Sequence, residues 1–217
     1  MPTPHRSKEP PPKRDRAFAA FEPLRTYLEA RATLTPSEID FIRTLFLPRR
    51  LEKGEALQQA GEPARYMVFV AKGCLRSYVI DDKGKVHIVR FAPEEWWLAD
   101  SARYLTGEPS TLFIDAIEAS DLLVIEHPSH QRILDGVPSY AAAYQVGLQR
   151  LAAAHDKRII SSLSASAHDR YRDFAATYPT LLRRVPLRML ASYLGMSPET
   201  LSRIRKKVST RASAPNR

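Results

Sequence analysis

The stretch "VPLRMLASYLGMSPETLSRIRKK", Val185 to Lys207, decides how this 217-residue chain is interpreted. It predicts two short helices separated by Gly195, which can supply the positive φ of a tight turn. The expected inner face consists of Leu187, Leu190, Ala191 and Leu194 in the first helix, Met196 beneath the turn, and Leu201 and Ile204 in the second. This spacing is typical of a helix-turn-helix, whose second helix enters the major groove of DNA.

The second helix is expected to begin with Ser197 as its N-cap and Pro198 at its first position. The residues predicted to meet double-stranded DNA are Ser197, Pro198, Glu199, Thr200, Ser202, Arg203, Arg205, Lys206 and Lys207. Glu199 can accept from the cytosine amine, Arg203 can bind guanine, and the basic residues that follow would bind phosphate. The alternative is that Glu199 and the basic run only complement the two ends of the helix dipole.

The distribution of charge favours the first interpretation. The formal net charge is +9. Residues 183–217 contain nine Lys or Arg and one acidic residue, Glu199, and residues 1–18 have a net charge of +3. The remaining residues have a net charge of −2, so the positive charge is concentrated at the two ends of the chain. A near-neutral body with one strongly cationic module indicates a polyanionic partner for that module.

The N-terminal part begins with residues 1 to 15, which are basic and rich in proline and are expected to form a disordered tail. Residues 16–137 are expected to form an N-terminal domain, beginning with two helices. The first, "FAAFEPLRTYLEARA", has Pro23 as a predicted break, and the second, "LTPSEIDFIRTLF", has Thr35 as its N-cap and a capping box with Glu38.

Short segments rich in β-branched and aromatic residues follow from about residue 50. They are "LEKGEAL", "YMVFVAKG", "CLRSYVI", "KVHIVRFA", "TLFIDAIEA" and "DLLVIE". The segments on either side of "DDKGK" predict a hairpin, because Gly84 can take a positive φ. Many short strands without intervening helices favour an antiparallel, jelly-roll-like β-roll. The fold class is therefore predicted to be α+β.

Residues 138–164 predict one long helix, with Ser139 as its cap. The side chains that recur at three- and four-residue steps are Tyr140, Tyr144, Leu148, Leu151, Ala154, Arg158 and Ile159. Such a helix is too long for a small barrel to cover, so we expect it to pair with the same helix of a second copy. The alternative is packing on the chain's own domains. Residues 165–217 are the expected DNA-binding domain with a short tail, and Ser166 is predicted to cap its first helix.

The order of these elements over about residues 30 to 208 resembles the Crp/Fnr superfamily of bacterial transcription regulators, and "SPETLSR" matches the family's recognition-helix pattern. The resemblance implies a β-roll of the cyclic-nucleotide-binding type, a long dimerisation helix and a DNA-binding domain. It also implies a cytoplasmic homodimer that binds a near-palindromic DNA site and regulates transcription, with RNA polymerase as a further candidate partner. Glu199 and Arg203 then occupy positions that read bases in relatives.

The effector half departs from the cyclic-nucleotide pattern. Nucleotide-binding relatives carry a Gly-Glu pair followed by an Arg-Ser pair, whereas this chain has "WWLAD" and then Ser110 and Thr111. Without the arginine, a cyclic phosphate lacks its main charged contact, so we do not expect cyclic AMP to bind. The candidate pocket for another, unidentified small-molecule effector comprises Tyr78, Phe91, Trp96, Trp97, Asp100, Ser110 and Thr111. The alternative is that the aromatic residues belong to the core. His87, on the "KVHIVRF" strand, is either an ordinary strand residue or a sensor of pH or of a ligand, and Cys74 is either a buried apolar residue or a redox sensor.

Other classes of function find little support in the sequence. It contains no phosphate-binding loop, nucleophile elbow or zinc-protease motif, so no catalytic residue is predicted. Its single cysteine, Cys74, and six scattered histidines predict neither a metal site nor a cofactor, and "HPSH" is expected to cap a helix near Pro128. No segment is apolar enough to predict a membrane span. The alternative function is a cyclic-nucleotide-binding-like module that acts through protein or anionic-membrane contacts. The effector, the target genes and the choice between activation and repression stay open.

Overall fold

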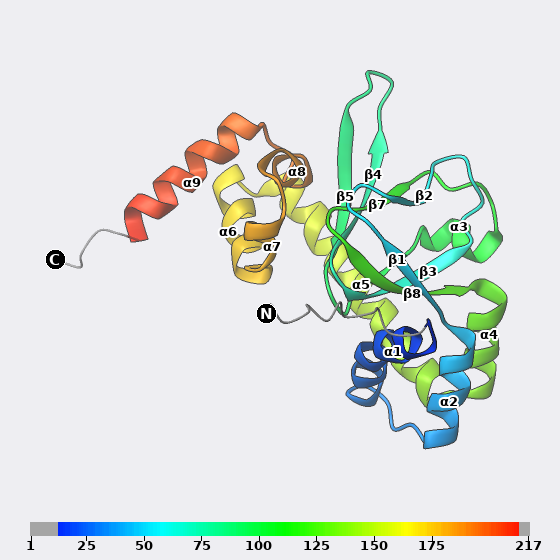
Figure 1. The fold of residues 1–217 in the computed structure, drawn as a ribbon. Coiled ribbons are helices and arrows are strands. Elements are labelled where there is room, and N and C mark those ends of the chain that lie inside the picture. The colour runs from blue at the N-terminus through cyan, green and yellow to red at the C-terminus, as the bar shows by residue number, and fades with distance from the viewer. Residues whose placement is uncertain (1–12, 213–217) are drawn as a thin grey trace, which may run out of the picture.

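The computed structural model describes residues 13–212. In chain order, the elements are α1 (Lys13–Glu29), α2 (Pro36–Leu45), β1 (Leu47–Leu51), β2 (Ala56–Gln58), β3 (Tyr66–Lys72), β4 (Leu75–Ile80), β5 (Val86–Ala92), β6 (Trp97–Leu98), α3 (Ser101–Thr106), β7 (Phe113–Ala116), β8 (Ser120–Glu126), α4 (His127–Gly136), α5 (Pro138–Ser164), α6 (Ala167–Thr177), α7 (Leu181–Arg184), α8 (Leu187–Tyr193) and α9 (Pro198–Ala212). Figure 1 shows a β-roll with α1, α2 and α4 on one side and α6 to α9 on another. The predicted α+β class is confirmed.

Two antiparallel four-stranded sheets form the roll, in the orders β1-β8-β3-β6 and β2-β7-β4-β5. The central strands β3 and β8 of the first sheet are buried on both faces. Alternate residues of β3 point to opposite sides of the sheet. Val68 and Val70 enter the core between the sheets, whereas Met67 and Phe69 pack under the N-terminal helices and α4. This double burial explains why "YMVFVA" reads as a continuous apolar run instead of an alternating one.

The strand predictions are confirmed for the five segments that contain β3, β4, β5, β7 and β8, and β4 and β5 form the predicted hairpin with Gly84 at φ +76°. The segment "LEKGEAL" is not one strand. It contains a turn between β1 and β2, in which Glu55 N donates to Glu52 O at 3.0 Å and Gly54 has φ +83°. The short strand β6 and the helix α3 were not predicted, because two- and six-residue elements are too short to show a period.

The N-terminal helices differ from their prediction in one respect. The capping box of α2 is present as predicted, with Thr35 accepting from Glu38 N and the Glu38 carboxylate accepting from Thr35 N. Pro23, however, does not break α1. Leu24 and Leu28 are buried against the roll, and this tertiary packing holds the helix together. The predicted tail lies outside the described residues except for residues 13–15, with which α1 begins.

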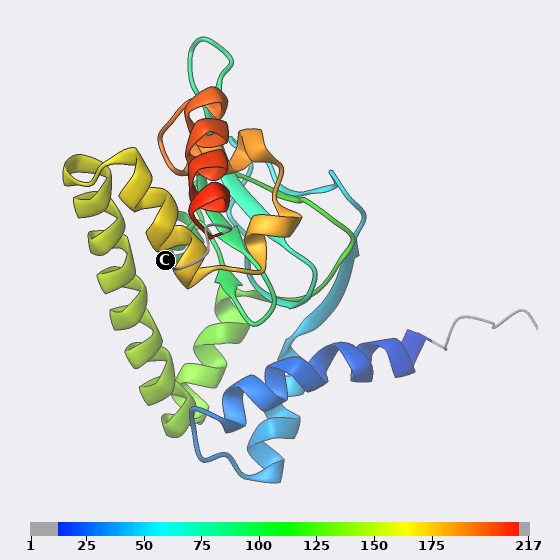
Figure 2. The ribbon, with the colours of Figure 1, turned by 90° about the vertical axis from the view of Figure 1, so that its left-hand side faces the viewer.

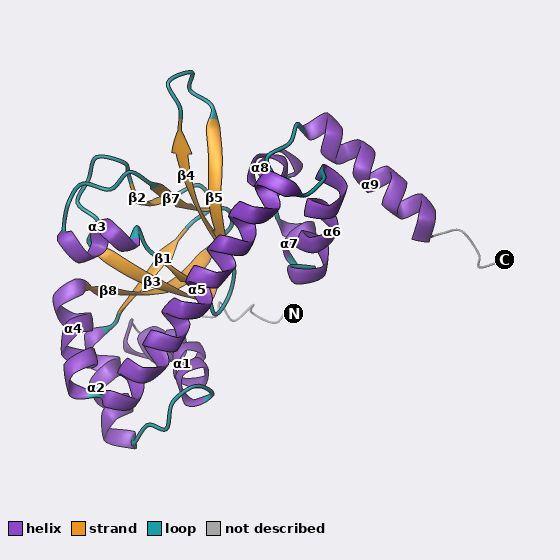
Figure 3. Cartoon of the chain, turned by 180° about the vertical axis from the view of Figure 1, so that it is seen from behind, coloured by secondary structure: helices purple, strands orange, loops and turns teal. Residues whose placement is uncertain are grey.

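The long helix α5 spans Pro138–Ser164, but Val137 and not Ser139 is its N-cap residue. Its N-terminal end is anchored in the roll, where Tyr140 is buried and Tyr144 packs against the same core. Figure 3 shows α5 running from the helices beneath the roll to the C-terminal domain, and Figure 2 shows its middle standing apart from the sheets. One helix therefore connects the roll to the C-terminal domain.

The C-terminal domain consists of α6 to α9. Ser166 caps α6 as predicted, since its side chain accepts from Asp169 N, and Tyr171 and Phe174 are buried. The four-residue helix α7 was not predicted. Leu181, Leu190 and Leu201 come from three different helices and are almost completely buried in one cluster. This cluster sets the angle between α8 and α9.

Candidate nucleic-acid interface

The turn between α8 and α9 has the geometry that the sequence predicts. Gly195 has φ +64°, and its N–H donates to Ser192 O at 3.1 Å. Met196 N donates to Ala191 O at 3.0 Å, so α8 ends in a tight, hydrogen-bonded turn. Ser197 Oγ then accepts from Thr200 N at 3.2 Å, and Pro198 is the first residue of α9. These local bonds fix where α9 begins.

The predicted inner face of the two helices is confirmed. Leu190 and Leu201 are completely buried, and Ala191, Leu194 and Ile204 are buried around them. Leu187 and Met196 are partly buried against the same cluster. Because one face of α9 is held in this way, the opposite face is presented in a fixed orientation.

The opposite face of α9 is polar and basic. Glu199, Arg203, Arg205, Lys206 and Lys207 are exposed, as is the cap residue Ser197, and Pro198, Thr200 and Ser202 are half-buried. Figure 1 shows α9 on the side of the C-terminal domain that faces away from the sheets. All nine residues predicted to meet DNA therefore lie on or beside one accessible helix.

Two side chains on this face have the chemistry to read bases. Arg203 makes one weak contact, from Nη2 to Thr200 Oγ1 at 3.3 Å, so most of its guanidinium donors face solvent. The pKa of the Glu199 carboxyl is lowered by a backbone N–H of its own residue and by the Ser197 hydroxyl. An ionised carboxylate and a guanidinium one helical turn apart can contact neighbouring base pairs.

The second predicted site, in the roll, is brought together only in part. Asp100, at the start of α3, lies close to two residues that precede β7. Its Oδ2 is 3.0 Å from Ser110 Oγ and accepts from Thr111 N at 3.1 Å. The Asp100 carboxylate thus occupies the hydroxyl and amide donors of these two residues. The nearby Arg103 is 3.4 Å from Glu108 instead.

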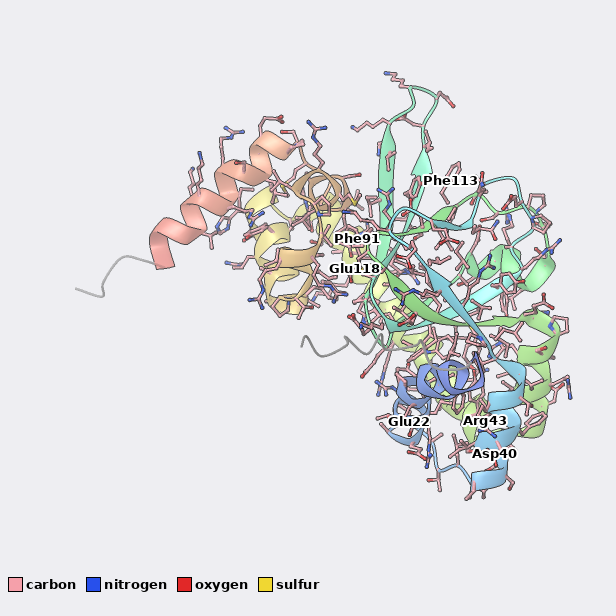
Figure 4. The ribbon with its side chains drawn as sticks, viewed as in Figure 1. Glu22, Asp40, Arg43, Phe91, Phe113 and Glu118 are labelled. Atoms are coloured by element: carbon pink, nitrogen blue, oxygen red, sulfur yellow. The ribbon has the colours of Figure 1, made fainter. Side chains whose placement is uncertain are left out.

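The four aromatic residues of this predicted site do not meet in one pocket. Trp97 packs with Phe69 on the outer face of the first sheet, at 5.1 Å between ring centroids. Trp96 contacts Tyr178 of α6's C-cap, and Phe91 contacts Tyr193 of α8. The ring of Tyr78 stacks on Phe113, 5.2 Å away. Figure 4 labels Phe91 and Phe113, which lie in different parts of the roll.

A buried ion pair between β4 and β7 of the second sheet was not predicted from the sequence. Arg76 Nε and Nη2 donate to the two carboxylate oxygens of Asp115 at 2.6 and 2.8 Å, and the side chains are only 18% and 10% exposed. The Arg76 guanidinium also lies 4.5 Å from the centre of the Tyr78 ring. The partners are 39 residues apart in sequence, so no local pattern connects them.

The remaining titratable candidates are paired or buried. Burial raises the pKa of Cys74 to about 12, so its reactive thiolate is strongly disfavoured. His87 Nε2 lies 2.8 Å from Asp81 Oδ2 on the hairpin. His130 does not cap α4, because its ring is buried and lies 3.1 Å from Tyr140 Oη.

Within residues 13–212 there is neither a cluster of metal-ligating side chains nor a helix that could span a membrane. In the described part of the chain, no three His, Cys, Asp or Glu side chains are grouped closely enough to hold a metal ion. Among the helices of residues 13–212, none combines the length and apolarity that crossing a bilayer requires.

Comparison with known proteins gives matches in sequence and in fold. Residues 48–136 match the family model described as the cyclic nucleotide-binding domain. The chain is also 27% identical over 188 residues to the fumarate and nitrate reduction regulatory protein of Vibrio cholerae, which covers 79% of this chain and 73% of that protein.

Among solved structures, FixK2 of Bradyrhizobium japonicum superposes with a TM-score of 0.64 at 20% identity, covering 78% of this chain and 89% of that one. The c-di-GMP responsive global regulator CLP of Xanthomonas campestris gives a TM-score of 0.66 at 15% identity, covering 84% and 96% of the two chains. The likeness in fold thus extends over most of the chain. The resemblance drawn from the sequence is confirmed.

Proposed function

We propose, from the premise that the chain is of the Crp/Fnr type in sequence and fold, that it is a sequence-specific DNA-binding regulator of transcription which acts as a homodimer. The observation that carries the proposal is the outer face of α9. Its start is fixed by the Ser197 cap, its inner side is buried, and Glu199 and Arg203 are exposed one turn apart. Such a face can enter a major groove, with Arg205 and Lys207 near the phosphates.

The dimer is supported by the apolar side of α5. Leu148 is 40% exposed, Ile159 57% and Leu163 84%, which is unusual for large apolar side chains on one helix. With Ala152 they follow one another at steps of four, seven and four residues, the spacing of a coiled-coil seam. Tyr140 and Arg158 were predicted to lie on the same side of α5 as Leu148 and Ile159, but they face the chain's own roll.

A symmetric pair of such helices would place two recognition helices on one side of the DNA. They would enter successive major grooves about 34 Å apart, and the bound site would be near-palindromic. The place of action of such a regulator is the cytoplasm, and whether it activates or represses depends on where its sites lie relative to promoters and RNA polymerase.

The effector site is proposed to be degenerate. Asp100 places a negative charge within hydrogen-bonding distance of Ser110 and Thr111, where a nucleotide phosphate would have to lie. A second anion at this position would be repelled and would find both donors already engaged. We therefore expect no binding of cyclic AMP at micromolar concentrations, measured by calorimetry with the full chain.

The proposed function is tested by selecting genomic DNA fragments with the purified full chain and searching them for a two-fold symmetric site. On that site, Arg203→Ala should cost about 1 to 3 kcal/mol of binding free energy, with little loss on random DNA. The matched control is Arg172→Ala, an exposed arginine of α6 that is 66% exposed and lies outside the helix-turn-helix. Equal losses on both DNAs would show that Arg203 contacts only phosphate.

The alternative module, without specific DNA binding, gives a different result in the same experiment. It would show no enriched sequence, and the chain would be retained on anionic vesicles in preference to duplex DNA. That outcome would contradict the proposed function.

A further inference from the structure

The C-terminal domain is attached to the roll at a second place besides α5. Arg184, at the end of α7, donates from Nη1 and Nη2 to the two carboxylate oxygens of Glu94, both at 2.8 Å. Its Nη2 also donates to Gly73 O at 2.9 Å and lies within hydrogen-bonding distance of Glu118 Oε1. We call Arg184, Glu94, Glu118 and Gly73 the clasp. Three of its four members belong to the roll, so it joins residues 66 to 111 positions apart in sequence.

The roll side of the clasp is itself fixed. Gly73 has φ +95°, and a Cβ at this position would lie 2.7 Å from Ser120 Cα and 2.8 Å from Ala119 O. Only glycine fits this conformation and this close approach. Gly73 N in turn donates to Glu94 Oε1 at 2.9 Å, so the carboxylate is held before it meets Arg184. A planar guanidinium that donates to acceptors from three residues sets direction as well as distance.

Apolar contacts continue beneath the clasp. Cys74, Phe91 and Ile117 of the roll form one buried cluster with Leu181 and Val185 of the C-terminal domain. Figure 4 shows Phe91 and Glu118 on the side of the roll that faces the C-terminal helices. The two domains therefore share a core at this point.

The edge strand β5 supplies a third attachment. Ser192 of α8 accepts from Ile88 N and donates to Val86 O, both at 3.0 Å. Arg158 of α5 donates to Ile88 O and to Tyr193 O, both at 3.3 Å. Because β5 lies at the end of its sheet, its outer backbone groups need partners, and α8 and α5 provide them. The first helix of the helix-turn-helix is thus bonded to the roll.

We propose that the clasp holds the C-terminal domain in one fixed position on the roll without any bound ligand, so that Arg184 is a positioning residue for DNA recognition. This rests on the proposed function. The clasp does not cover the predicted DNA-binding face, because α9 faces away from the roll (Figure 1) and Glu199 and Arg203 are exposed. The clasp is built only from residues of this chain, and in the roll Asp100 already occupies the donors of Ser110 and Thr111, so the proposed orientation needs no ligand.

The clasp is tested with the full-length chain by two measurements on Arg184→Ala. Amide exchange at Ile88 reports the attachment, since this N–H is bonded to Ser192 across the domain boundary. Binding to the selected DNA site reports positioning. We expect faster exchange at Ile88 and about tenfold weaker binding to the site, with random DNA bound as before, because two freely moving recognition helices lose their preset spacing. The matched control is Arg183→Ala, the exposed neighbour on α7, which should change neither.

A second variant keeps the test valid if Arg184→Ala destabilises the C-terminal domain. Glu94→Gln together with Glu118→Gln alters only the roll and should reproduce both effects, while amide exchange along α9 stays unchanged. Unchanged exchange at Ile88 and unchanged site affinity in both variants would overturn the proposal. Tighter site binding would also overturn it, since the clasp would then be inhibitory.

The two proposals can fail separately. If the wild-type chain binds no preferred DNA site, the proposed function fails. Exchange at Ile88 still decides whether the clasp holds the domains together.

Discussion

The polar residues of the roll and those of α9 are used in opposite ways. In the roll, Arg76 donates from Nε and Nη2 to the two carboxylate oxygens of Asp115. The carboxylate of Asp100 is hydrogen-bonded to Ser110 and Thr111. On α9, Arg203 has one weak neighbour. Polar groups that satisfy one another stabilise a fold, whereas polar groups presented on a rigid helix are available to a partner. By this difference, the outer face of α9 is better suited than the polar residues of the roll to bind a partner.

Two arginines that lie 19 residues apart show the same difference. Arg184 donates to three residues of the roll, Glu94, Gly73 and Glu118. Arg203 lies on the exposed face of α9 and donates weakly to Thr200. The residue type is identical, and what differs is the number of hydrogen-bond partners within the chain.

The largest effect is expected from removing one half of the buried ion pair. Asp115→Leu leaves the Arg76 guanidinium, which is 18% exposed, without its partner and should lower the free energy of unfolding by about 3 to 5 kcal/mol. Denaturant unfolding followed by tryptophan fluorescence measures this, since Trp96 and Trp97 both lie in the roll. The double variant Arg76→Leu with Asp115→Leu should recover most of the loss. A single variant as stable as the wild type would show that the pair is not effectively buried.

A slightly smaller effect is expected from His130. Burial, and next the nearby His127, lower its pKa from 6.5 to about 4. The unfolded chain therefore takes up a proton at a pH where the folded chain does not. This contribution to stability is complete above pH 6.5 and is lost as the pH falls from 6.5 towards 4, by about 3 kcal/mol in all.

The measurement compares unfolding of the wild type and His130→Gln across this pH range. Carboxylates titrate in both proteins, so the difference between the two curves isolates His130. Parallel curves for the wild type and His130→Gln would mean that the ring is accessible to water.

The parts of the fold that the sequence predicted correctly depend on short-range signals. The caps at Thr35, Ser166 and Ser197 each involve a residue only three positions away. The Gly195 turn and the inner face with Leu190 and Leu201 follow from local conformation and helical period. The exposed face of α9 follows from the same period, so which of its residues are accessible could be predicted from the sequence. That these residues contact DNA stays a prediction.

The parts that were missed depend on contacts between distant residues. Pro23 stays within α1 because the roll packs against that helix. On α5, contact with the roll decides which residues are buried and which remain exposed. The clasp joins Arg184 to Gly73, 111 positions away. Nothing in the spacing of a sequence specifies such pairs, since they form only when the whole fold brings the elements together.

The smallest effect is expected at the start of α9. Ser197→Ala removes the side-chain acceptor for Thr200 N and should destabilise the first turn of α9 by about 1 kcal/mol. Amide exchange at Thr200 should become faster while exchange at the buried Leu201 and Ile204 changes little, because packing and not the cap holds the later turns. Ser197→Asp should restore the protection, since its carboxylate accepts the same bond. Ser202→Ala, on the outer face of the same helix, controls for the loss of a hydroxyl alone. If both alanine variants behave alike, the cap does not fix the start of the helix, and the orientation of Glu199 and Arg203 must come from packing alone.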